Sequence, residues 1–144
     1  MLPVAKGAIV ISPTSTTNAA TTTGTLDTLG YDFAIIDVMS TTSNDTTNNF
    51  SVLKIEEGDT TSAYSAITAL TGDGTGGFTI AAADTSTPVI VAKFHIDLTG
   101  RKRHLKLTAS PVTTQTIWAH AELLRGDEIP STATKVNASV LVEV

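Results

Sequence analysis

Short segments in which apolar and polar residues alternate cover most of the chain. The clearest, at 88–98, places Ile90, Ala92, Phe94, Ile96 and Leu98 on one face and Lys93, His95 and Asp97 on the other. A period of two residues is typical of a half-buried β-strand. The pattern therefore predicts a strand here, with His95 on its exposed face.

Similar patterns predict further strands between tracts rich in turn-forming residues. We expect these strands at 8–12, 25–30, 31–39, 50–57, 62–67, 78–82, 102–109, 115–125 and 135–144. The segment at 31–39 is apolar on both faces, which is typical of a central or covered strand. Thr99 and Gly100 indicate a turn, and we expect 88–98 and 102–109 to pair as a hairpin.

About eight short strands without a sustained helical period predict an all-β fold, an antiparallel β-sandwich or a jelly-roll-like barrel. A chain of 144 residues suits one domain, 1–144, and we find no internal repeat or domain boundary. The segment at about 12–24 is rich in Thr and Asn, and we expect it to form a loop near the N-terminus.

Composition narrows the classes of partner. The net charge of −5 disfavours nucleic acid, because phosphate contacts need a basic surface. No apolar stretch approaches the roughly 20 residues that span a bilayer, and we expect no signal peptide and no membrane partner. Without cysteine the chain forms neither a disulfide nor a thiolate zinc site. Only 16% of residues are charged, compared with about 25% in ordinary domains, which favours a protein packed against other subunits.

Residues suited to catalysis or metal binding are few. His95 and His104 flank the expected hairpin and would lie together on its exposed face, in a spacing that no common metal motif uses. The glycine-rich loop at 72–77 precedes a strand rather than a helix, unlike a phosphate-binding loop. Asp59 and Asp73 lack the acidic ladder of a calcium site. We therefore predict no catalytic residue, no metal, no cofactor and no enzymatic activity.

Two features are candidates for a partner interface. Arg101, Lys102 and Arg103 form the densest basic run, either a latch for an acidic partner or a solvated hairpin corner. Arg103 is in phase with the inward Leu105, so its stem should lie toward the core rim. Trp118 is the only tryptophan. Depending on the phase of its strand, Trp118 is either an outward interface anchor or part of the core.

Three blocks of sequence resemble small structural proteins of phages and prophages. Residues 25–38 contain Leu-Asp-Thr-Leu-Gly-Tyr followed by an apolar strand. Residues 53–64 contain a strand followed by an acidic pair and an Asp/Gly turn. Residues 96–107 carry Asp-Leu-Thr-Gly-Arg-Lys-Arg before a second strand, with His104 where an aromatic residue is commoner. The chain resembles the capsid decoration, or cement, proteins of tailed bacteriophages.

The resemblance implies a structural virion protein. It would be made in the host cytoplasm and would clamp neighbouring major capsid subunits on the capsid outer surface as a homotrimer. The alternative from the residues is a carbohydrate- or cell-surface-binding β-sandwich module, such as a phage adhesin or a lectin-like domain. Sugar-binding sites usually contain aromatic rings on which the sugar stacks, and only 5% of this chain is aromatic.

Overall fold

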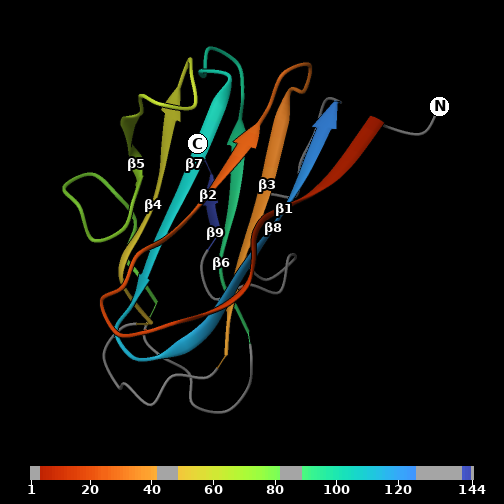
Figure 1. The fold of residues 1–144 in the computed structure, drawn as a ribbon. Helices are drawn as coiled ribbons and strands as arrows, with labels where there is room; N and C mark the ends of the chain where they lie inside the picture. Colours follow the sequence, from red (N-terminus) through yellow and green to blue (C-terminus); the bar gives the residue numbers. More distant parts are fainter. Residues whose placement is uncertain (1–3, 42–48, 82–88, 126–140, 144) are drawn as a thin grey trace.

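The protein folds as a sandwich of two β-sheets (Figure 1). The computed structural model describes residues 4–41, 49–81, 89–125 and 141–143, and within them it contains no helix. The strands are β1 (Val4–Thr16), β2 (Thr22–Asp27), β3 (Phe33–Ser40), β4 (Phe50–Gly58), β5 (Ser65–Thr71), β6 (Val89–Asp97), β7 (His104–Pro111), β8 (Gln115–Arg125) and β9 (Leu141–Glu143). The predicted all-β sandwich is confirmed.

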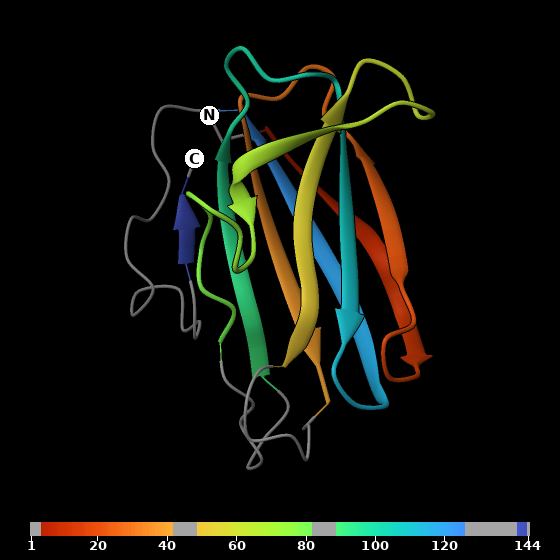
Figure 2. The same cartoon turned by 90° about the vertical axis from the view of Figure 1, so that its left-hand side faces the viewer.

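One sheet has five strands in the order β1-β8-β3-β6-β9, and the other has four in the order β2-β7-β4-β5. Figure 2 shows the two sheets nearly edge-on, facing each other. Neighbouring strands are antiparallel except β6 and β9, which are parallel. β3 lies between β8 and β6, which confirms that the segment apolar on both faces is a central strand.

The core lies between the sheets and follows the predicted alternation. Its largest fully buried apolar side chains come from both sheets: Ile36, Phe50, Leu53, Ile55, Leu70, Phe94, Ile96, Leu105, Leu107, Ile117 and Leu123. The inward face predicted at 88–98 (β6) and the inward Leu105 of β7 are therefore confirmed. Val142 of β9 is also buried, whereas most of the strand predicted at 135–144 lies outside the described residues.

The predicted hairpin between 88–98 and 102–109 is wrong. β6 belongs to the five-stranded sheet and β7 to the four-stranded sheet, so the turn at Gly100 carries the chain from one sheet to the other. Alternation identifies the buried face of each strand but not its partner, and two successive strands with inward faces can lie in opposite layers of a sandwich.

Several predicted boundaries also need correction. β1 extends to Thr16 and β2 begins at Thr22, so the loop expected at 12–24 shrinks to 17–21 because threonine is itself a good strand residue. The returning strand expected at 62–67 is β5, which runs from Ser65 to Thr71. Residues 78–81 form no strand, although Phe78 packs against the core.

Two edge strands approach each other closely on one side of the sandwich. A Cβ atom at Gly24 of β2 would lie 1.9 Å from the backbone oxygen of Val10 in β1. The register of β1 against β8 shifts between Ile9 and Ile11, and such irregularities bend a strand. The bend and the missing side chain together let β1 pack across the edge of the opposite sheet.

Candidate functional site

The three blocks that resemble phage proteins meet at one end of the sandwich. Each contains a loop at that end, between β2 and β3 (28–32), between β4 and β5 (59–64) and between β6 and β7 (98–103). Figure 2 shows these loops side by side at the top of the molecule. We call this surface the loop end. Segments far apart in the sequence thus form a single surface.

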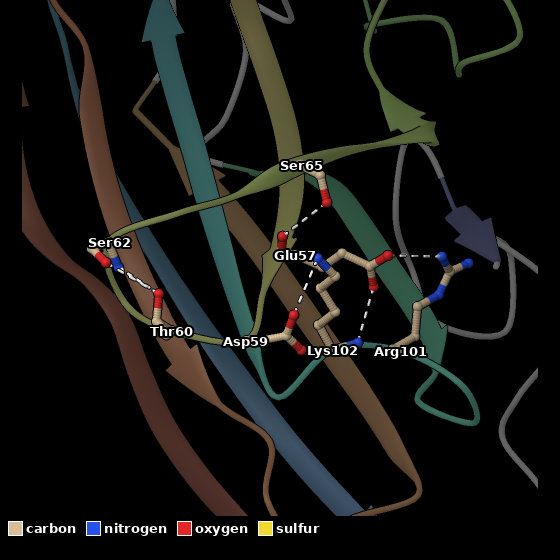
Figure 3. A network of polar contacts seen from close by, with 7 residues as sticks. All are labelled: Glu57, Asp59, Thr60, Ser62, Ser65, Arg101 and Lys102. Carbon is tan, nitrogen blue, oxygen red and sulfur yellow. Dashed lines mark hydrogen bonds and ion pairs between the residues drawn. The ribbon is translucent and has the colours of Figure 1, made fainter.

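The basic run lies at the loop end and pairs with acidic residues of the same chain. Glu57 Oε1 lies 3.9 Å from Arg101 Nη1, and the backbone N–H of Lys102 donates to Glu57 Oε2 at 3.2 Å (Figure 3). Lys102 Nζ lies 3.3 Å from Asp59 Oδ2. These contacts fasten the β6–β7 loop to the end of β4 and to the loop that follows.

Arg103 makes the most regular contact of the three. Its Nε and Nη2 donate to the two carboxylate oxygens of Asp27 at 2.9 and 2.7 Å, a bidentate geometry. This hydrogen bonding to Arg103, helped by the backbone N–H of Leu29, holds the pKa of Asp27 well below its usual range. Arg103 is exposed, so the expectation that its stem lies toward the core rim is wrong. Its carboxylate partner is 76 residues away in sequence.

The outer face of the four-stranded sheet carries a second cluster of charges. Lys54 and Lys106 contact the two carboxylate oxygens of Glu56 at 3.1 and 3.0 Å. Burial alone would raise the pKa of Glu56, but the hydrogen bonds from the two lysines outweigh it and the pKa is lowered. Lys106 Nζ also lies 4.6 Å from the centre of the Tyr64 ring, so that face of the ring is occupied by a cation.

The outer face of the five-stranded sheet is mixed, because apolar side chains of β3 and β8 lie beside the ion pair of Asp37 with Lys93. Ile117 and Ala119 are buried, so Trp118 points outward, and it is half-buried opposite Met39 of β3. Phe33 and Ile35 are further half-buried residues on this face of β3. Of the two phases open for Trp118, the structure selects the outward one.

Neither of the two histidines is exposed as the alternation predicted. His95 is 1% exposed and His104 is 9% exposed, and they belong to different sheets. The predicted exposed histidine pair is therefore wrong. Within the described residues no group of three or more His, Cys, Asp or Glu side chains could hold a metal ion. Asp59 pairs with Lys102, and Asp73 accepts a hydrogen bond from the backbone N–H of Ile80.

The sequence identified the cations of the loop end but missed their partners. Asp27, Glu57 and Asp59 lie at or next to turns in two of the three blocks. Acidic residues beside these turns were the sequence signal that could have identified the partners of the cations. No helix in the described part of the chain is long and apolar enough to cross a membrane. Comparisons with family models, with curated proteins and with solved structures found no match.

Proposed function

We propose that the chain is a structural virion protein that decorates a tailed-phage capsid and clamps neighbouring major capsid subunits. The observation that carries the proposal is the convergence of the three resembling blocks at the loop end. These loops are alternate connections along the chain, so the antiparallel topology by itself brings them to one end; what goes beyond topology is the set of ion pairs that joins them. Their meeting in one ion-paired surface favours a shared binding role.

The ion pairs of the loop end suit a preformed contact surface. They join three loops before any partner arrives, so binding would order few side chains and would lose little conformational entropy. Loops held on a rigid sandwich are a common place for binding residues. The basic run would then contact the partner through those of its N–H donors that are not already bonded to Asp27, Glu57 or Asp59.

The proposal includes a homotrimer held by the outer face of the five-stranded sheet. Trp118 and Met39 form an apolar patch on that face, beside the ion pair of Asp37 with Lys93, and aromatic residues are common at the centres of interfaces. Light scattering of the purified chain is expected to give about three times 14.9 kDa. Trp118→Ser should shift the chain toward monomers, whereas Val52→Ser on the other sheet should not. Monomeric wild-type protein, free and on capsids, would refute the trimer.

Capsid binding tests the function itself. Capsids from a phage that lacks the gene for this chain are mixed with the purified protein and sedimented, and the bound protein is measured over a concentration series. We expect saturable binding at a fixed ratio to the major capsid protein. Failure to bind such capsids would refute the proposed function.

A further inference from the structure

The loop end presents one large apolar side chain to solvent. Leu29, in the β2–β3 loop, is 66% exposed, and it is among the few large hydrophobic residues exposed in the described part of the chain. Its neighbour Thr28 is 6% exposed. An isolated exposed leucine is unremarkable by itself. What distinguishes Leu29 is how firmly the surrounding backbone is held.

Leu29 lies at the second position of a tight turn. The backbone N–H of Tyr31 donates to the backbone oxygen of Thr28 at 3.2 Å, and Gly30 between them has a φ of 86°. A positive φ at the third position is the pattern of a type II turn, which favours glycine there. At this position the side chain of Leu29 extends into solvent.

Both sides of the turn are fastened to other strands. The backbone N–H and the hydroxyl of Thr28 donate to the backbone oxygen of Arg103 at 3.0 and 2.7 Å. Asp27, held by the Arg103 guanidinium, accepts the N–H of Leu29 at 3.1 Å. On the other side, the Arg125 guanidinium donates to the backbone oxygen of Gly30. The turn is therefore preorganised, and Leu29 projects from it beside exposed charges of both signs.

We propose that Leu29 is an apolar anchor that inserts into an apolar socket on the major capsid protein. The charged rim of Asp27, Arg103 and Arg125 would meet polar groups around that socket. A central apolar residue within a polar rim is a common arrangement at protein interfaces. The preorganised turn supplies the anchor at little entropic cost. This inference rests on the proposed function and assigns the residue that makes the capsid contact.

The test uses the capsid-binding assay with three variants. Leu29→Ser is expected to weaken binding about tenfold to a hundredfold, since burying a leucine side chain is worth that much affinity. Leu29→Met should bind nearly as well as wild type, because it keeps an apolar side chain of similar volume. Val52→Ser is the matched control, an apolar-to-serine change at a 38% exposed residue of β4, away from the loop end, and should bind normally.

Folding and function are separated by two readouts. Leu29 is largely exposed, so Leu29→Ser should melt within a few degrees of wild type. Wild-type binding together with undiminished binding of Leu29→Ser would overturn this inference and leave the proposed function standing. Equal weakening by Leu29→Ser and Val52→Ser would also overturn it. Absence of wild-type binding would overturn the proposed function, and the inference with it.

Discussion

The approach of β1 to β2 can be tested by adding a single methyl group at Gly24. The new Cβ would lie 1.9 Å from the Val10 backbone oxygen, whereas ordinary contact begins at 3.4 Å. The two strands would therefore have to separate by roughly 1.5 Å, the difference between these distances. The two nearest atoms, the carbonyl oxygen and carbon of Val10, belong to the backbone, so a change of side-chain rotamer cannot relieve the strain.

We expect Gly24→Ala to destabilise the fold by about 2 to 3 kcal/mol, the upper part of the usual range for overpacking. For a domain of this size, that corresponds to a fall in melting temperature of roughly 6 to 12 °C. Thermal unfolding followed by circular dichroism at a fixed protein concentration measures it, because oligomers melt in a concentration-dependent way.

Gly7→Ala is the matched control in β1. There the nearest atom to a new Cβ is His120 Nε2 at 3.2 Å, at the end of a side chain that can turn away. Replacing a strand glycine by alanine restricts the unfolded chain, so we expect a neutral effect or a gain of up to about 1 kcal/mol. If Gly24→Ala melted at the temperature of Gly7→Ala, the close approach of β1 and β2 would be refuted.

Three further predictions concern the core and the loop end. Phe94→Ala, at a residue 0% exposed, should cost about 3 to 5 kcal/mol in thermal unfolding, and a loss under 1 kcal/mol would contradict the described core. Asp27 has a lowered pKa, so its contribution is present above the unfolded pKa of about 3.9 and is lost as the pH falls below it. The difference in melting temperature between wild type and Asp27→Asn should therefore be greatest near pH 7 and narrow below about pH 4; a difference independent of pH would count against the pair. Replacing Arg101 and Lys102 together by Ala should leave melting nearly unchanged and should weaken capsid occupancy mostly at low salt. The half-buried Arg101–Glu57 pair is long, at 3.9 Å, and the exposed Lys102–Asp59 pair contributes about 0 to 1 kcal/mol. Unaltered occupancy at every salt concentration would mean that the basic run is only a solvated turn.

The sequence predicted the buried faces of the strands better than the pairing of the strands. Alternation located the buried faces of β6 and β7 because burial follows the two-residue period of a strand. It could not place β6 and β7 in different sheets, since the same pattern arises in a hairpin and in a connection across a sandwich. His95 shows the same limit, because its position in the strand is outward but its surroundings bury it.

The loop end was only half predictable for a similar reason. The basic run is visible as three successive cations, and the resembling blocks drew attention to each loop separately. The pairing of Arg103 with Asp27 and of Lys102 with Glu57 joins residues 76 and 45 positions apart. Such contacts depend on which strands become neighbours, and no local pattern contains that information. The exposure of Leu29 could not be predicted either, since a Leu-Gly pair in a turn does not by itself determine whether the leucine is buried.

Quantitative mass spectrometry of purified virions tests the central claim most directly. Virions are purified from the phage that encodes this chain, and its copy number is measured relative to the major capsid protein. A decoration protein that clamps neighbouring subunits should be present in a fixed ratio to the major capsid protein and in a comparable number of copies. Absence of the chain from virions, or its presence in only a few copies per particle, would contradict the account.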